Sequence, residues 1–314
     1  MLRGRGAGGV RVRFRIRWCA FRRGRVRILV VDHVGGRMPS VQRVTSRNAR
    51  FQQWEALLGN RKKRNQLREF LVQGVRPISL AVEYGWRVRA LLYDDSRKLS
   101  GWAREVLGAV EGERVALAPE LMAELGEKSG GAPEVVAVVE VPADDLERIE
   151  AGPEFLGVLF DRPTMPGNIG SIIRSADAFG AHGMIVSGHA ADVYDPKSVR
   201  ATTGSLFSLP TVRVPSPAEV MAWVERRRAA GLPLVLVATD EKGDADVYDF
   251  DFTQPVLLLV GNETSGLAGA WREVCDVTVS IPMAGAASSL NAANAATAVL
   301  YEASRQRAAA RRAD

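Results

Sequence analysis

Small and polar residues follow two predicted strands in the carboxyl-terminal part of the chain. The apolar run 256–260 has the length and branching of a strand buried on both faces, and residues 261–266 make a polar turn bounded by glycines. A second strand, 277–281, leads into a loop of Gly, Ala and Ser residues and then into a helix, 289–305. Ligands of open α/β sheets bind beyond the carboxyl ends of the strands, so both junctions are candidates for a ligand site. Two ordinary connecting loops would give the same pattern.

A third junction is followed by a predicted helix that carries an arginine. Strand 155–160 runs into a polar loop that ends at Asn168, which is suited to cap that helix. With successive residues about 100° apart, the apolar residues of the helix cover about 120° of one side, and Arg174 lies roughly opposite them. Arg174 is therefore predicted to be exposed. Periodicity alone does not separate a functional arginine from a solvated one.

The composition limits the chemistry that these residues can support. A chain of 314 residues, 46% of them hydrophobic, is long enough for two domains, and no apolar stretch reaches the ~18 residues of a membrane span. Cys19 and Cys275 are too few for a disulfide framework, and the three histidines lack ligand spacing. We expect a protein of the reducing cytoplasm with no metal and no membrane association. No GxGxxG follows the first strand of the carboxyl-terminal α/β pattern, and no GK[ST] motif occurs, which argues against a dinucleotide oxidoreductase or a P-loop ATPase.

Basic residues are concentrated in the amino-terminal quarter of the chain. Residues 1–37 hold 11 arginines and one acidic residue, a balance of +10, and residues 38–76 add +7. Because the whole chain carries +6, residues 77–314 carry −11. Phosphates attract clustered Lys and Arg, so this distribution predicts a nucleic-acid contact surface near the amino terminus.

The first 40 residues alternate arginine with apolar residues. This period is that of a strand, but the like charge is too high for the segment to pack alone, and we expect it to be disordered. It is either an RNA-binding arm or the product of arginine-rich codons upstream of a misplaced start, with Met38 as the true beginning. A secretory signal is not expected, because no unbroken apolar core follows the arginines.

Two α/β patterns follow this extension. Residues 41–142 form the first predicted domain, 143–154 a polar linker with prolines nearby, and 155–314 the second domain. The predicted strands are 88–92, 135–141, 155–160, 183–187, 234–238, 256–260 and 277–281, and the predicted helices include 78–83, 101–110, 119–125 and 218–230. The candidates for RNA contact in the first domain are Arg47, Asn48, Arg50, Arg61, Lys62, Lys63 and Arg64. A solvated helix face would also explain the last four.

Three stretches of the second domain together resemble the SpoU, or TrmH-type, ribose 2′-O-methyltransferases of the SPOUT class. They are DRPTMPGNIGSIIRSADAFGA, LLLVGNETSGL and IPMAGAASSLNAANAATAVLYEA. Their order and separation fit that family over residues 155–305. Residues 44–140 are similar to the ribosomal-protein-like substrate domain of the family, and residues 1–37 lie outside the resemblance.

The resemblance implies an α/β protein in which a small L30e-like domain precedes a trefoil-knotted SPOUT methyltransferase domain. It also implies S-adenosylmethionine bound in the knot by three loops, and a homodimer formed through the carboxyl-terminal domain. The residues implied in cofactor binding are Thr239, Val260, Gly261, Asn262, Gly266, Ile281, Met283, Ser289 and Leu290. The small residues among them, such as Gly261, Gly266 and Ser289, would let the backbone approach the cofactor closely.

Arg174 is the residue that the resemblance places against the ribose 2′-hydroxyl. Arginine stays protonated below about pH 12, so we expect it to hold the adjacent phosphate and stabilise the developing alkoxide rather than to act as a base. Asn168 and Glu263 would orient Arg174 and its loop, while Ser289 and Asn291 would shape the third loop and the acceptor site.

The expected function is 2′-O-methylation of a uridine in 23S rRNA, which would confer resistance to a ribosome-targeting antibiotic. The alternatives are a non-catalytic RNA-binding or ribosome-assembly protein with a knotted domain, a tRNA 2′-O-methyltransferase and a small-molecule methyltransferase. Two positions depart from the family pattern. Thr264 stands where Gly or Ala is common, and Ser288 stands where Glu is common, which removes a carboxylate.

Overall fold

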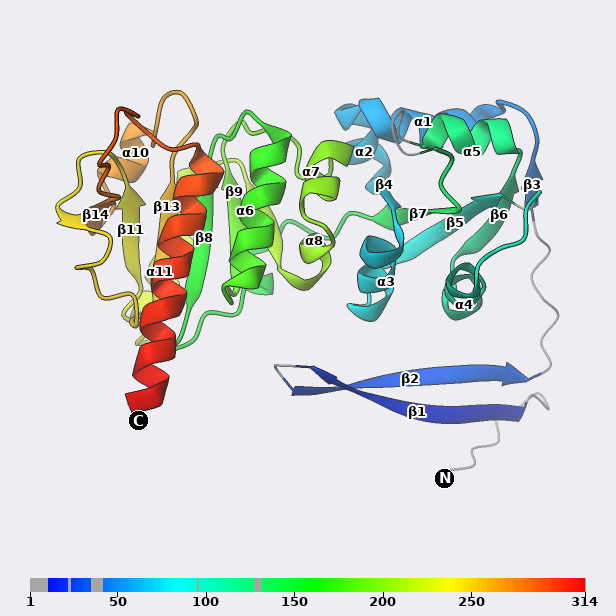
Figure 1. Cartoon of the computed structure of the whole chain (residues 1–314), viewed down its shortest axis with the longest axis horizontal. Coiled ribbons are helices and arrows are strands. Elements are labelled where there is room, and N and C mark those ends of the chain that lie inside the picture. The colour runs from blue at the N-terminus through cyan, green and yellow to red at the C-terminus, as the bar shows by residue number, and fades with distance from the viewer. Residues whose placement is uncertain (1–10, 22–23, 35–41, 95, 127–130, 314) are drawn as a thin grey trace.

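The amino-terminal extension contains a β-hairpin. The computed structural model describes residues 11–21, 24–34, 42–94, 96–126 and 131–313, and in the first two ranges it describes the backbone alone. Strands β1 (Arg11–Phe21) and β2 (Gly24–Val34) pair antiparallel as a separate two-stranded sheet (Figure 1). The period-two alternation of arginine with apolar residues is compatible with this strand pairing.

The first domain is built on a five-stranded mixed sheet with the order β3-β6-β5-β7-β4. Its strands are β3 (Gln42–Val44), β4 (Glu69–Gln73), β5 (Val88–Asp94), β6 (Glu113–Leu117) and β7 (Val135–Glu140). Its helices are α1 (Ala49–Gly59), α2 (Arg61–Leu67), α3 (Val75–Glu83), α4 (Gly101–Ala109) and α5 (Pro119–Leu125). Helix α5 has the predicted bounds. The short edge strand β3 was not predicted, because three residues show too little periodicity.

The second domain is built on a seven-stranded sheet in which all paired neighbours are parallel, with the order β10-β9-β8-β13-β11-β14-β12. Its strands are β8 (Leu156–Asp161), β9 (Gly183–Ser187), β10 (Thr211–Val214), β11 (Val235–Thr239), β12 (Ala245–Asp246), β13 (Val256–Val260) and β14 (Val277–Ser280). Strands β9 and β13 have the predicted bounds. Every residue of both strands is buried, and β13 is an uninterrupted apolar run.

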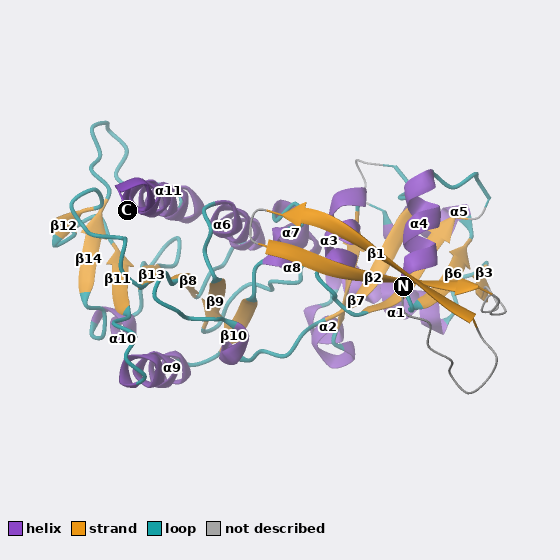
Figure 2. Cartoon of the chain, turned by 90° about the horizontal axis from the view of Figure 1, so that it is seen from below, coloured by secondary structure: helices purple, strands orange, loops and turns teal. Residues whose placement is uncertain are grey.

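Helices cover both faces of this parallel sheet (Figure 2). They are η1 (Leu146–Arg148), α6 (Pro166–Ala178), α7 (Pro196–Ala201), α8 (Ser205–Ser208), α9 (Pro217–Ala229), α10 (Gly269–Arg272) and α11 (Ala292–Ala313). The apolar residues of α6 and α11 share one core with Val158, Leu258 and other residues of one sheet face. Those of α9 and α10, including Trp223 and Trp271, pack on the opposite face.

Aromatic side chains join the two domains. Phe70 of β4 contacts Tyr194 with ring centroids 4.8 Å apart, and Trp86 meets Phe207 of α8 edge-on at 5.0 Å. The Trp86 indole also donates a hydrogen bond to the Phe207 carbonyl at 3.1 Å. A Cβ added at Gly204, where φ is +104°, would lie 2.5 Å from Leu80 of α3. The domains are therefore held by close packing as well as by the linker.

Candidate active site

The candidate loops meet at one edge of the parallel sheet. Strands β8, β13, β11 and β14 are consecutive neighbours, and their carboxyl ends point the same way (Figure 1). The loops that follow them carry, in that order, the residues 161–165, 261–266, 239–240 and 281–291. The parallel topology thus brings together the junctions that the sequence singled out.

Glu263 is the acceptor that ties the second loop to the first. Its carboxylate accepts hydrogen bonds from the Thr164 backbone N (3.1 Å), the Thr164 Oγ1 (3.0 Å), the Met165 backbone N (3.3 Å) and the Asn168 Nδ2 (3.0 Å). Partial burial opposes ionisation of this group, but the hydrogen bonds outweigh burial and hold the pKa of Glu263 below its usual value. Glu263 therefore acts as an ionised acceptor that orders residues 164–168, and not as a proton donor.

Asn168 and Asn291 extend this network to the third loop. The Asn291 Nδ2 donates to the Asn168 Oδ1 at 3.3 Å, and the Asn291 Oδ1 accepts from the Ala293 backbone N at 2.9 Å, which caps α11. The expectation that Asn168 caps α6 is wrong. That helix begins at Pro166 with Met165 at the cap position, so the 9% exposed Asn168 lies inside the first turn. The proline was the better start signal.

Arg174 lies on the exposed side of α6, as predicted, two turns beyond Asn168. Within the described part of the chain, its guanidinium has no hydrogen bond or ion pair with another side chain. On the neighbouring side, the Ser175 and Thr297 hydroxyls lie 2.7 Å apart and link α6 to α11. The site therefore presents a cation that remains available to an incoming anion such as phosphate.

The second loop closes on itself. Asn262 and Gly266 exchange two backbone hydrogen bonds of 3.0 Å, and the Asn262 Oδ1 accepts from the backbone N atoms of Thr264 (2.9 Å) and Ser265 (3.0 Å). A Cβ at Gly261 would lie 2.6 Å from the carbonyl carbon of Gly266. The glycine at 261 is thus required by the closure of the loop itself, in addition to any need for close approach by a ligand.

The third loop offers what an adenine-containing cofactor needs. Residues 282–291 are exposed, including the apolar side chains of Met283 (41% exposed) and Leu290 (40%). Among the described residues, no hydrogen bond satisfies the backbone N–H groups of 283–290, and Ser289 has no side-chain partner. Free backbone donors beside apolar side chains suit a purine ring, so the loop fits S-adenosylmethionine. At the adjoining junctions, the Thr239 Oγ1 donates to the Leu259 carbonyl (3.2 Å), Val260 is buried and Ile281 is half-buried.

Known proteins match both halves of the chain. The model for the SpoU L30e-like domain matches residues 48–137, and the model for the SpoU rRNA Methylase family matches residues 156–301. The 23S rRNA (uridine(2479)-2′-O)-methyltransferase of Streptomyces viridochromogenes is 74% identical over 279 residues, which cover 89% of this chain and 97% of that protein. This chain belongs to the SpoU rRNA methylase family.

Solved structures of SpoU methyltransferases support the same assignment. The crystal structure of the SpoU methyltransferase AviRb from Streptomyces viridochromogenes in complex with AdoMet superposes with a TM-score of 0.81 at 76% identity, covering 83% of this chain and 99% of that one. An AdoMet-bound rRNA methyltransferase from Sinorhizobium meliloti gives 0.75 at 32% identity, covering 84% and 98%. The α/β fold class, with an L30e-like domain before the methylase domain, is confirmed.

Arg64 of this SpoU methylase is not available to RNA, which corrects the expectation for the basic cluster. It is 2% exposed, and its Nε donates to the Asp192 Oδ2 at 2.7 Å, while its Nη2 lies 3.4 Å from the Asp195 Oδ2. Its Nη1 donates to the Leu57 carbonyl at 2.7 Å. Both acidic partners are about 130 positions away in the sequence, and no local pattern reveals them. Arg64 joins the two domains.

The remaining RNA candidates divide into two groups. Arg47 and Arg50 are engaged with acidic side chains, Arg47 with Glu55 and Glu124 and Arg50 with Glu113. Asn48 caps α1 by accepting from the Phe51 backbone N, and Arg61 donates to the Ala190 carbonyl at 2.6 Å. Lys62 and Lys63 are exposed on α2. The two lysines are therefore the best-presented cations of the cluster.

A serine continues the inter-domain contact toward the site. The Ser198 Oγ lies 2.9 Å from the carbonyl oxygens of both Asp192 and Pro166, and it is fully buried. Pro166 is the first residue of α6, which carries Asn168 and Arg174. Sequence reasoning missed this connection and the role of Asp192, which lies outside the motifs. Thr164 lies inside the first motif, but its role depends on hydrogen bonds to Glu263, 99 positions away.

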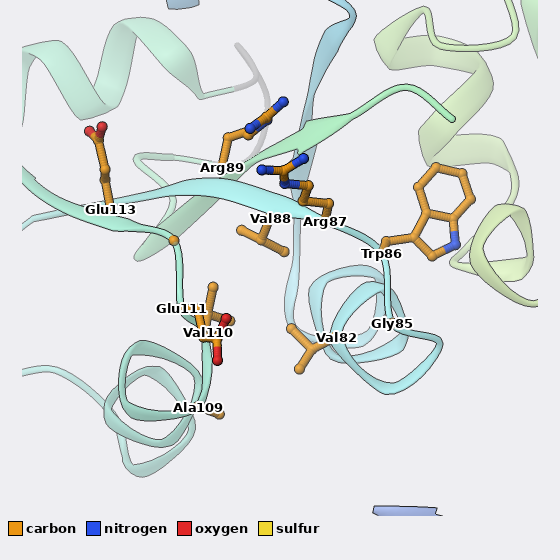
Figure 3. A pocket seen from close by; sticks show the side chains of 11 residues that line it. Val82, Gly85, Trp86, Arg87, Val88, Arg89, Ala109, Val110, Glu111 and Glu113 are labelled. Carbon is orange, nitrogen blue, oxygen red and sulfur yellow. The ribbon is translucent and has the colours of Figure 1, made fainter. Parts of the chain in front are cut away.

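A pocket of about 470 Å³ lies in the first domain, away from the candidate site. It is bounded by the ends of α3 and α4 and by the first residues of β5 and β6, with Arg87 and Arg89 along one wall (Figure 3). Both arginines pair with Glu140. Among the described residues, no group of acidic, His and Cys side chains could hold a metal ion, and no helix could span a membrane.

Proposed function

We propose that this chain transfers a methyl group from S-adenosylmethionine to the ribose 2′-hydroxyl of a uridine in 23S rRNA, in the cytoplasm. The observation that carries the proposal is the network in which Glu263, Asn168 and Asn291 join three loops beside an exposed Arg174. The 74% identity to a 23S rRNA (uridine-2′-O)-methyltransferase supports the substrate.

The proposed chemistry uses Arg174 to position and stabilise the acceptor. The cofactor supplies an electrophilic methyl group on a sulfonium, and the acceptor hydroxyl must lie in line with it and lose its proton. A guanidinium holds a neighbouring phosphate with two parallel hydrogen bonds and stabilises the alkoxide as it forms. Because arginine stays charged, the proton passes to a phosphate oxygen or to water.

The proposed cofactor site comprises the three loops, with Thr239, residues 260–266 and residues 281–290 as their binding segments. The 281–290 segment contributes its exposed backbone N–H groups and the side chains of Met283 and Leu290. Ser289 would face the acceptor or the cofactor rather than the Glu263 network. We also propose the trefoil knot in this domain that the family resemblance implies.

We propose that the first domain binds RNA, in part through the exposed face of α2.

We propose further that the protein acts as a homodimer through its second domain, and that methylation lowers the affinity of the ribosome for an antibiotic. Exposed apolar side chains beside the site support a protein contact there. They are Met165 (54% exposed) and Tyr301 (59%).

The experiment is methylation of purified RNA with labelled cofactor. The wild-type protein is incubated with 23S rRNA, 16S rRNA or bulk tRNA, and digested nucleosides are separated by mass spectrometry. We expect one 2′-O-methyluridine per molecule of 23S rRNA and none in the other RNAs. Label in tRNA alone, or cofactor binding without any methyl transfer, would contradict the proposed substrate or the proposed activity.

A further inference from the structure

Arg162 has a backbone conformation that side chains rarely adopt. Its φ is +47°, in the left-handed region, where a Cβ crowds the following carbonyl oxygen and free energy is lost relative to glycine. Such conformations persist where surrounding contacts compensate for them, and they concentrate at functional sites. Arg162 directly follows β8, at the sheet edge where the candidate loops meet.

The contacts of Arg162 join three strand ends. Its backbone N donates to the Ser187 carbonyl at the end of β9 (2.9 Å), and its carbonyl accepts from the Asn262 Nδ2 (2.6 Å). Its Nε donates to the Asp161 Oδ2 at 3.0 Å, and its Nη2 donates to the Gly266 carbonyl at 3.1 Å. The second cofactor loop is thus held at both of its ends by one residue.

Neighbouring residues leave room for this side chain and fix its charge. Gly188 has φ +71°, and a Cβ there would lie 2.8 Å from the Arg162 Cγ. Asp161 is 1% exposed, and its Oδ2 also accepts from the Ala268 backbone N at 2.9 Å, just beyond the loop. A buried carboxylate therefore orients the guanidinium while anchoring the chain that leaves the loop.

We propose that Arg162 is a positioning residue that holds the loop 261–267 in the shape that binds S-adenosylmethionine. The strained backbone is retained because it aims the guanidinium at Gly266 and the carbonyl at Asn262. This inference rests on the proposed function, since it concerns the same cofactor. It assigns to Arg162 a role in cofactor affinity and none in the transfer step.

The test is Arg162→Gly, which relieves the backbone strain and removes the side-chain contacts. S-adenosylmethionine binding is measured by calorimetry and thermal stability by differential scanning. We expect the cofactor Kd to rise at least tenfold and the melting temperature to fall, because the buried Asp161 loses its cation. The KM for the cofactor should rise in parallel, while kcat at saturating cofactor stays within about threefold. Arg162→Lys keeps a positive charge beside Asp161 but lacks the second guanidinium nitrogen that donates to the Gly266 carbonyl. Its cofactor Kd should therefore lie between those of the wild type and Arg162→Gly.

Arg68 provides a matched control. It also has a left-handed φ, +52°, and it also donates to backbone carbonyls, those of Val141 and Pro142, but it lies in the first domain. Arg68→Gly should leave the cofactor Kd within twofold. A Kd within twofold of wild type for both Arg162 variants would overturn the proposal, as would a fall in melting temperature without a change in Kd. Wild-type protein that binds cofactor but methylates no rRNA would sink the proposed function and leave the role of Arg162 standing.

Discussion

Glu263 receives four hydrogen bonds and therefore orders the site only while it is ionised. Its pKa in the folded protein lies below the usual 4.5. A carboxyl group with a lowered folded pKa contributes stability that is fully present above its unfolded pKa, and that contribution is lost as the pH falls through the folded pKa. Near neutral pH, the Glu263 network is intact.

We predict from this that Glu263→Gln loses stability at neutral pH and little at acidic pH. The amide NH₂ of glutamine is a donor, so it would face the donor groups of Thr164 or Asn168 and one hydrogen bond of the network would be lost. After allowance for solvent screening, the loss should be about 1 kcal/mol at pH 7. Urea unfolding from pH 7 to pH 3 would show the two curves converging below about pH 4.5. A difference that stays constant over this range would contradict the role of the charge.

Arg174→Ala should abolish methyl transfer while leaving cofactor affinity within a few-fold. Arg174 is exposed and makes no contact that folding requires, so the free energy of unfolding should change by no more than about 0.5 kcal/mol. Arg312→Ala, at the exposed end of α11, is the matched control and should remain fully active. Single-turnover rates on 23S rRNA provide the measurement, and near-native turnover of Arg174→Ala would remove it from the catalytic site.

Helix α2 shows how far local sequence predicts function at the scale of an element. Four adjacent basic residues look equivalent in the sequence, yet the helix buries Arg64 and exposes Lys62 and Lys63. Adjacent helical residues cannot all share one face, so some division was expected. Arg64 is the buried residue because it donates a hydrogen bond to Asp192, which lies far away in the chain.

The exposed pair on α2 gives a prediction about RNA binding. Each lost phosphate contact lowers the slope of log affinity against log salt by roughly 0.7–0.9. Lys62→Ala/Lys63→Ala should therefore give a slope shallower by about 1 to 2 and leave the cofactor Kd unchanged. Lys98→Ala, an exposed lysine elsewhere in the same domain, is the control. Filter binding from 50 to 300 mM salt tests this, and an unchanged slope would mean that α2 is only a solvated surface.

Other elements were predicted well or poorly for physical reasons. The strands that bring the candidate loops together, such as 256–260, are apolar runs, and burial on both faces of a parallel sheet removes them from water. The loop residues Glu263 and Asn291 were found through their motif. Arg162 was not found, because its positive φ and its bonds to distant loops arise only after the strands have assembled. Local pattern thus predicts the framework, whereas long-range polar contacts need the structure.

At the scale of the whole molecule, the buried Arg64–Asp192 pair is a polar link between the domains. Arg64→Met alone leaves the buried Asp192 with only the more distant Arg213 guanidinium, at 4.0 Å, and should cost up to about 3–5 kcal/mol of unfolding free energy. The double variant Arg64→Met/Asp192→Asn should cost less than the sum of the single variants, with a coupling of about 1–3 kcal/mol. Denaturant unfolding of the four proteins measures this coupling, and additive losses would contradict a direct interaction.

The proposed dimer predicts complementation between two inactive variants. If Arg174 of one protomer serves the cofactor site of its partner, mixing Arg174→Ala with a loop variant such as Asn262→Ala should restore up to about a quarter of the activity, the yield of one intact site per mixed dimer. Sedimentation should show a dimer at micromolar concentration. A fully active monomer, or no recovery after mixing and refolding together, would contradict this arrangement.

The inter-domain contact also limits how evolution or an engineer can recombine this chain. Arg64 in the first domain is matched to Asp192 and Asp195 in the second, and Gly204 is matched to the bulk of Leu80. If the first domain were joined to a methylase domain without those acidic residues, Arg64 would be buried without an anionic partner. A residue larger than glycine at position 204 would clash with Leu80 and push the domains apart. A first domain can therefore be exchanged only together with the residues of the second domain that contact it.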